Sequence, residues 1–231
     1  MTTFNFPFGA QVTPCRASAD GPRRVFVLGA YPSALHVAWT PPKPHRRIAA
    51  IAVDNEPEPF WTGADQDDRV AQWRRAVGFV EAWGKIAPCG SLNGPSGAWV
   101  ERRILEPLGA LRSEAWITDC LDTYRASTGG AARMADTYAP FAKTCGQPQA
   151  RVAPHPSEND IVREALRDHR TRLLDELRAA RPDVLVTLEN PVQVCATCGR
   201  RLCVQKTLRR HGVTLAHGTF HLQEPVSVCP A

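Results

Sequence analysis

The stretch PSENDIVREALRDHRTRLLDELRAARPDVLVTL (156–188) decides the fold, because it joins the clearest helix of the chain to a buried strand. Ser157, with Asp160 three residues later, is typical of a capped helix start, and Pro182 ends the helix. The pattern therefore predicts a helix over 158–181 and a strand over 184–188. The predicted apolar stripe of the helix consists of Ile161, Val162, Ala165, Leu166, His169, Leu173, Leu177 and Ala180.

Strand signals alternate with helix signals along the rest of the chain. The strand signals lie at 23–29, 48–53, 114–119, 184–188 and 213–216. Strands interleaved with helices predict a mainly parallel sheet. We therefore expect an α/β fold in which residues 1–231 form a single three-layer domain, with helices flanking a central four-stranded sheet. Residues 1–22 are expected to be an N-terminal extension, and 195–211 a basic, cysteine-containing segment within the domain.

Length and composition exclude several classes of protein. The 231 residues are 43% hydrophobic and 22% charged, which is typical of a globular rather than a disordered chain. No apolar run reaches the length of a membrane span, and the N-terminus lacks the pattern of a signal peptide. We expect a cytoplasmic monomer whose cysteines are mainly reduced or metal-bound. The absence of a dinucleotide fingerprint, a GxxxxGK[ST] loop and a GxSxG elbow disfavours nucleotide-cofactor enzymes, P-loop ATPases and α/β-hydrolases.

The formal net charge of +5 is unevenly distributed along the chain. Basic residues outnumber acidic ones by six to one in residues 1–50 and by four to one in residues 201–231. Two basic ends would suit a polyanionic ligand if they meet in space. Because ligand sites of parallel sheets form at the carboxyl ends of the strands, the residues that follow each strand are the first candidates.

The motifs at these strand ends resemble those of the uracil-DNA glycosylase superfamily, over residues 23–221. The residues that carry the resemblance are Gly29-Ala30-Tyr31-Pro32 after the first strand, Phe60-Trp61 after the second, Ile117-Thr118-Asp119 with Arg125 downstream, the stretch 154–188, and His217 after the last strand. The stretch 154–188 is similar to the iron–sulfur branches, but the cysteine spacing differs, so the cluster is not carried over. The resemblance implies a DNA glycosylase that flips a base out of double-stranded DNA, hydrolyses its glycosidic bond and needs no cofactor for catalysis.

The residue Asp119 departs from the resembling enzymes, which hold an asparagine that reads uracil at this position. An ionised carboxylate only accepts hydrogen bonds, so it suits the exocyclic amine of cytosine. We hypothesise that the flipped base is a modified cytosine, such as the glucosylated 5-hydroxymethylcytosine of phage DNA, and that the enzyme acts in antiviral defence. The alternative is that Asp119 only caps the following loop.

The remaining roles follow from the need to stabilise charge on the sugar and on the departing base. His217 is expected to donate to the leaving base, and Asp54 or Glu189 to act near the sugar. Phe60 or Trp61 would stack on the base beside Tyr31, with plain core packing as the alternative for the pair. The candidates for binding DNA phosphates are Ser33, His36, His155, Ser157 and Thr219. Tyr31 stands where water-activating families hold Asp or Asn, so the candidate water activators are Asp54, Glu58, Asp119 and Glu189.

Three cysteines form a compact cluster, Cys195-x-x-Cys198 followed by Cys203. A CxxCG turn is typical of zinc knuckles, and Cys145, Cys229 or His211 would complete four ligands. A structural zinc ion is therefore one interpretation, and buried thiols or a redox pair are the alternatives.

Three other functions remain open from the sequence. They are a uracil-DNA glycosylase of base-excision repair, a non-catalytic DNA-binding module on the same fold, and a hydrolase of small N-glycosides. A steep salt dependence of DNA binding separates the last from the others.

Overall fold

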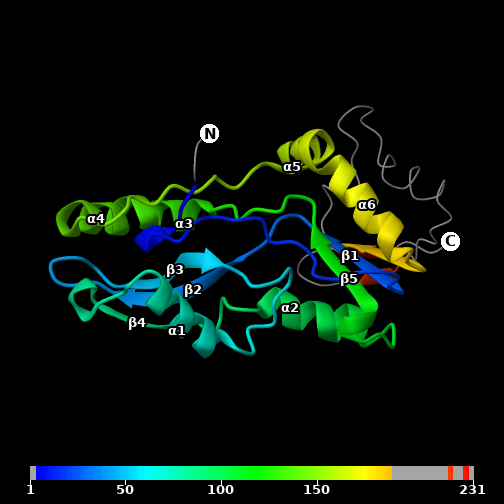
Figure 1. Cartoon of the computed structure of the whole chain (residues 1–231), viewed down its shortest axis with the longest axis horizontal. Coiled ribbons are helices and arrows are strands. Elements are labelled where there is room, and N and C mark those ends of the chain that lie inside the picture. Colours follow the sequence, from blue (N-terminus) through cyan, green and yellow to red (C-terminus); the bar gives the residue numbers. More distant parts are fainter. Residues whose placement is uncertain (1–3, 189–217, 221–225, 229–231) are drawn as a thin grey trace. The chain divides into compact units, whose positions relative to one another are not determined.

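The computed structural model describes residues 4–188, 218–220 and 226–228 (Figure 1). The chain forms two compact units, each made of three segments. Unit 1 comprises Met1–Cys15, Ser33–Ala98 and Thr123–His155, and unit 2 comprises Arg16–Pro32, Trp99–Asp122 and Pro156–Ala231. The predicted mixed α/β class is confirmed. The expectation of a single domain over 1–231 stays a prediction.

Unit 2 is built on three parallel strands. β1 (Val25–Gly29) lies between β5 (Ala115–Asp119) and β6 (Val184–Thr187), and it is parallel to both. The short strands β8 (Val226–Val228) and β7 (Gly218–Phe220) extend the sheet beyond β6 in antiparallel fashion, which gives the order β5-β1-β6-β8-β7. The predicted strand at 213–216 lies outside the described residues. The fourth parallel strand and the glycosylase-like fold therefore stay predictions.

The helix predicted over 158–181 forms in three continuous pieces. They are α5 (Glu158–Glu164), a π-helical turn η6 (Ala165–His169) and α6 (Arg170–Ala180). The Ser157 hydroxyl accepts the amide of Asp160 at 3.3 Å and donates to its carboxylate at 2.6 Å, which confirms the predicted cap. Figure 1 shows α6 lying along the strands of unit 2. This packing buries a cluster that includes Phe26, Trp116, Ile161, Leu177, Ala180 and Leu185.

Two shorter elements of unit 2 precede β5. They are the π-helical turn η3 (Glu101–Leu105) and the 3-10 turn η4 (Arg112–Glu114). The turn η3 continues from α2 (Pro95–Val100), in which the boundary between the units falls at Ala98. Ile104 and Leu105 are buried, so η3 contributes apolar side chains to the interior.

Unit 1 holds a separate antiparallel sheet of three strands, in the order β3-β2-β4. The strands are β2 (Ala34–Thr40), β3 (Ile48–Asn55) and β4 (Lys85–Pro88). The prediction that residues 48–53 join the parallel sheet is therefore wrong. The physical reason is that 34–40 also form a strand, and the loop 41–47 is too short for the crossover that a parallel pairing needs.

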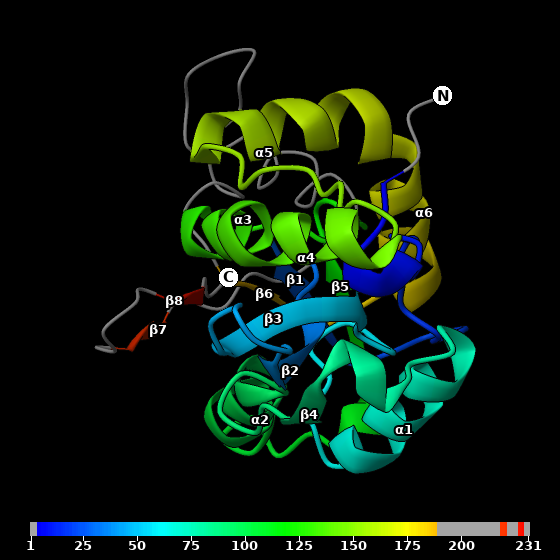
Figure 2. The same ribbon diagram turned by 90° about the vertical axis from the view of Figure 1, so that its left-hand side faces the viewer.

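Helices pack against both faces of the sheet of unit 1 (Figure 2). One face carries α3 (Thr128–Arg133), the π-helical turn η5 (Met134–Tyr138) and α4 (Ala139–Cys145), and the other carries α1 (Gln66–Ala76). The unit also contains the 3-10 turns η1 (Pro7–Gly9) and η2 (Glu81–Trp83). Its core is aromatic, with Phe8, Trp39, Trp73, Tyr138 and Phe141 all buried. In the part of the chain that the structure describes, no helix combines the length and the apolar character needed to cross a membrane.

Candidate functional site

The candidate site lies at the carboxyl ends of β1 and β5 in unit 2. The register of the parallel pair places Gly29 opposite Asp119. Beyond the strands, the Cys120 amide donates to the Gly29 carbonyl and the Leu121 amide donates to the Ala30 carbonyl, both at 2.9 Å. The turn after β1 and the segment after β5 therefore run side by side. Asp119, 2% exposed, begins that segment as a buried carboxylate.

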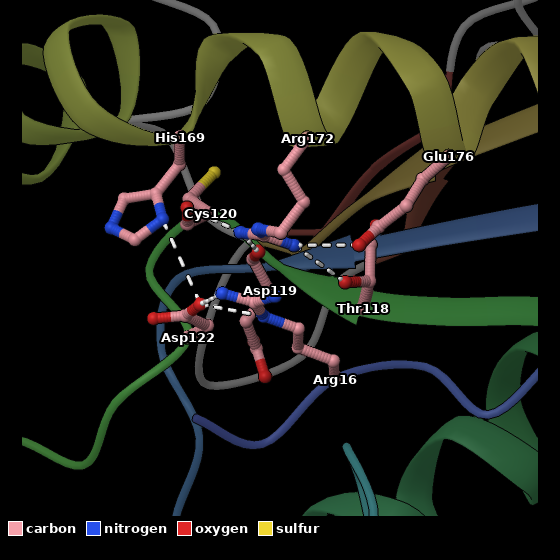
Figure 3. Close-up of polar contacts among 8 residues, drawn as sticks. All are labelled: Arg16, Thr118, Asp119, Cys120, Asp122, His169, Arg172 and Glu176. Atoms are coloured by element: carbon pink, nitrogen blue, oxygen red, sulfur yellow. Dashed lines mark hydrogen bonds and ion pairs between the residues drawn. The ribbon is translucent and has the colours of Figure 1, made fainter. Parts of the chain in front are cut away.

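Arg172 of α6 holds the segment after β5 by its backbone (Figure 3). Its guanidinium donates to the carbonyls of Asp119 and Cys120 at 2.8 and 2.9 Å, and to the Thr118 hydroxyl at 3.2 Å. Glu176, one turn along the helix, pairs with the same guanidinium at 2.9 Å. The side chains of Arg172 and Glu176 are only 14% and 12% exposed, so the pair is largely removed from water. Arg172 therefore fixes the backbone from which Asp119 projects.

A second buried carboxylate, Asp122, follows three residues later. Its Oδ2 atom accepts a hydrogen bond from Nε of Arg16 at 2.9 Å, and a terminal nitrogen of the same guanidinium forms an ion pair with that oxygen at 2.8 Å. The Nδ1 atom of His169 lies 3.9 Å from the same oxygen (Figure 3). The Asp122 side chain is 6% exposed and the His169 side chain 16%. Asp122 thus faces two basic groups from different segments of unit 2.

The surroundings of His169 lower the pKa of its imidazole and so favour its neutral form. Burial is the main cause that lowers the pKa of its imidazole, and the positive charge of Arg172 adds to the effect. The negative charges of Asp122, Glu164 and Asp168 oppose it, with Asp122 the strongest of the three. A neutral imidazole keeps one ring nitrogen as a proton acceptor.

Sequence reasoning assigned neither Arg172 nor His169 to a site. His169 was placed in the apolar stripe of the helix, and a titratable side chain in such a stripe is the signal that points to it. Arg172 binds backbone carbonyl groups, which every residue has, so the sequence does not indicate its partners.

Two of the predicted site residues, His36 and Asp54, lie on the sheet of unit 1, and Ser33 directly precedes its strand β2. The Ser33 amide donates to Glu56 at 2.8 Å, and Asp54 accepts hydrogen bonds from the backbone and side-chain amides of Asn55. Burial raises the pKa of Asp54, and these two bonds partly offset the effect. His36 lies in β2, where its backbone exchanges hydrogen bonds with the Asn93 side chain at 2.8 and 2.9 Å. Burial lowers the pKa of His36.

The Phe60-Trp61 pair belongs to unit 1 as well. Trp61 is 4% exposed within the aromatic core, and its indole nitrogen donates to Asp65 at 2.6 Å. Phe60 is half-buried and has a left-handed backbone with φ 54°. The structure thus places Trp61 in a core position, while the stacking role of either ring stays a prediction.

The other candidates are distributed between the two units. His155 is exposed, and its backbone amide donates to Ala126 at 2.8 Å in unit 1. In unit 2, Ser157 caps α5 and Thr219 lies in β7, while Tyr31 is half-buried against the cluster beneath α6. His217, Glu189 and the cysteines Cys195, Cys198 and Cys203 lie outside the described residues. Among the predicted site residues, the structure therefore brings the turn that contains Tyr31 next to Asp119 in unit 2. The candidates in unit 1 form a separate group.

Metal ligands are not grouped within residues 4–188, 218–220 and 226–228, since no three His, Cys, Asp or Glu residues there could hold an ion together. Cys145, a possible fourth zinc ligand, is free and exposed. Comparison with known proteins finds no matching family model, no matching curated protein and no matching solved structure.

Proposed function

We propose that this chain is a DNA glycosylase that excises a modified cytosine, such as glucosylated 5-hydroxymethylcytosine, and leaves an abasic site. The observation that carries the proposal is the buried carboxylate of Asp119 beside the Gly29–Pro32 turn, at the carboxyl edge of a parallel sheet. Ligand sites of such sheets lie at this edge. The net charge of +5 is compatible with a DNA substrate.

The chemistry of Asp119 favours cytosine over uracil. Cytosine presents an exocyclic amine, which donates to a carboxylate, whereas uracil presents a carbonyl oxygen at the same position. An ionised carboxylate would repel that oxygen, because both groups are acceptors. A base read in this way must first be flipped out of the duplex into the site. The hold of Arg172 on the Asp119 backbone would keep the carboxylate in place for this reading.

The test is an excision assay with duplexes that carry uracil, cytosine or glucosylated 5-hydroxymethylcytosine, followed by alkali to cut abasic strands. We expect scission of the modified-cytosine duplex. Asp119→Ala should lower the rate by about 10²-fold or more, since a buried polar contact to the base is lost. Asp175→Asn is the matched control, because this exposed carboxylate pairs with Arg178 on the surface of α6. Scission of the uracil duplex alone, or an unchanged rate in Asp119→Ala, would contradict the proposal.

A further inference from the structure

We propose that His169, positioned by Asp122, is the base that activates the attacking water in the proposed glycosylase reaction. The inference rests on the function proposed above and adds a residue that the strand-end motifs do not supply. Tyr31 stands where the resembling enzymes hold an Asp or Asn for this step. His169 comes instead from the long helix that covers the sheet of unit 2.

The backbone of the helix changes at His169. The residue closes the π-helical turn η6, and its φ and ψ are −117° and −1°, away from helical values. Tyr138 closes the π-helical turn η5 in the same way, yet its φ and ψ of −73° and −43° are regular. π-helical turns within α-helices are frequent at functional sites, and the region near ψ 0° is one in which active-site residues occur. Of these two π-helical turns, only η6 ends in a residue whose φ and ψ lie away from ideal α-helical values.

The surroundings of His169 define which nitrogen is the base. Nδ1 faces the Asp122 carboxylate at 3.9 Å, and Figure 3 shows the other ring nitrogen turned away from it. A carboxylate acceptor beside Nδ1 favours the tautomer with the proton on that atom. Nε2 then carries the lone pair. The distance is longer than a hydrogen bond, and such contacts often shorten only when substrate binds.

Burial and the surrounding charges act on the pKa of the imidazole in opposite directions. Asp122 faces it from the segment after β5, Arg172 from α6, Glu164 from α5 and Asp168 from η6. Burial and Arg172 lower the pKa of His169, whereas the three carboxylates raise it. A general base works best when its pKa lies near the working pH. Asp122 contributes most among the carboxylates, so it both orients the ring and maintains its basicity.

The proposed reaction consumes only water and the flipped nucleotide. The water oxygen bonds to C1′ of the deoxyribose while the C1′–N1 bond of the cytosine breaks, and its electron pair leaves on N1. Nε2 of His169 takes the proton that the water loses. The departing base gains a proton, directly or through solvent, and His169 returns to its neutral form. The products are an abasic deoxyribose and the free base.

The experiment measures single-turnover excision by the full chain against pH, with a gel-shift measurement of duplex affinity. We expect His169→Gln to lower the rate by about 10²- to 10⁴-fold with unchanged DNA affinity. Added imidazole should partly restore His169→Ala, which a purely structural role would not allow. The wild-type rate should fall as His169 is protonated at acid pH. Asp122→Asn should move this acid limb to lower pH, because the carboxylate raises the pKa of His169. Asp175→Asn is the matched control, since its exposed carboxylate pairs with Arg178 on the surface of α6.

The outcomes separate the two proposals. If the wild type excises the modified base but His169→Gln and imidazole-free His169→Ala stay within about threefold of it, this inference is overturned and the proposed function stands. An acid limb that does not move in Asp122→Asn rejects the positioning role. If the wild type excises no base, both proposals fail. Circular dichroism identifies any variant that fails to fold. If one of His169→Gln and His169→Ala is unfolded, the excision rate of the other tests the role of His169.

Discussion

The hydrogen bonds from Arg172 to the end of β5 predict how much stability the protein loses when this side chain is replaced. Arg172→Met keeps the apolar stem of the side chain but removes the donors to the carbonyls of Asp119 and Cys120, and it leaves the Glu176 carboxylate largely buried without its cation. Hydrogen bonds to a charged group contribute roughly 1.5–3 kcal/mol each, and they are not additive. Removing one partner of a buried ion pair costs about 3–5 kcal/mol. We therefore expect a loss of about 3–5 kcal/mol in the free energy of unfolding of unit 2.

Urea unfolding measures the global loss, and hydrogen exchange of a peptide covering 115–122 measures it at β5 itself. Arg178→Met is the matched control, because Arg178 pairs with Asp175 on the surface, where the two side chains are 58% and 61% exposed. Exposed pairs contribute at most about 1 kcal/mol. A second comparison tests the mechanism, since removing Glu176 together with Arg172 should cost less than removing Arg172 alone. Equal losses for Arg172→Met and Arg178→Met, with no faster exchange at β5, would refute the reasoning.

Three further predictions concern unit 1, and urea unfolding measures each of them. Trp61→Ala should lower the free energy of unfolding by about 3–5 kcal/mol, because it empties a core position and removes the hydrogen bond from the indole to Asp65. A loss under about 1 kcal/mol would contradict the core placement. Burial lowers the pKa of His36 in the folded protein below its ordinary value of 6.5. Below pH 6.5 the unfolded chain therefore binds a proton that the folded protein does not, and this favours unfolding. Stability should therefore fall as the pH drops from 7 to 5, and the fall should be smaller in His36→Gln; equal slopes would show that His36 is not the group. Gly97→Ala should cost about 1–3 kcal/mol, because a Cβ there would overlap the backbone carbonyls of residues 60 and 61. Gly129→Ala in α3, where the nearest atom is the end of a flexible arginine at 3.5 Å, should instead be neutral or stabilising, and the same sign for both glycines would reject this account.

Local signals made part of the fold predictable from the sequence. The helix over 158–181 was predictable because its cap, its apolar stripe and Pro182 are all close in sequence. The strand β5 was predictable as an apolar run that ends in a polar residue. The strand β2 was missed, since prolines on both sides of residues 34–40 indicate a loop, and its strand character depends on pairing with β3 and β4.

The candidate site was predictable only where it follows strand ends. Asp119 was found in this way, because parallel strands share one carboxyl edge. The contact between Arg172 and the Asp119 carbonyl joins residues 53 positions apart, and a backbone acceptor carries no residue-specific signal. His169 fits the helical period, so its titratable side chain was the one sequence signal that set it apart from its apolar neighbours, and its contact with Asp122 was visible only in the structure.

The interleaving of the two units has a consequence for synthesis on the ribosome. Unit 1 ends at His155, so all its segments have been translated before α5 begins. The first segment of unit 2 begins at Arg16 and is translated long before its last segment, which supplies α6 and β6. The nascent β1 can pair with β5, but it lacks β6 and the helix that covers it until more than half of the chain has followed. During that interval the apolar side chains of β1 are exposed to aggregation, and binding of the nascent chain by a chaperone would protect them.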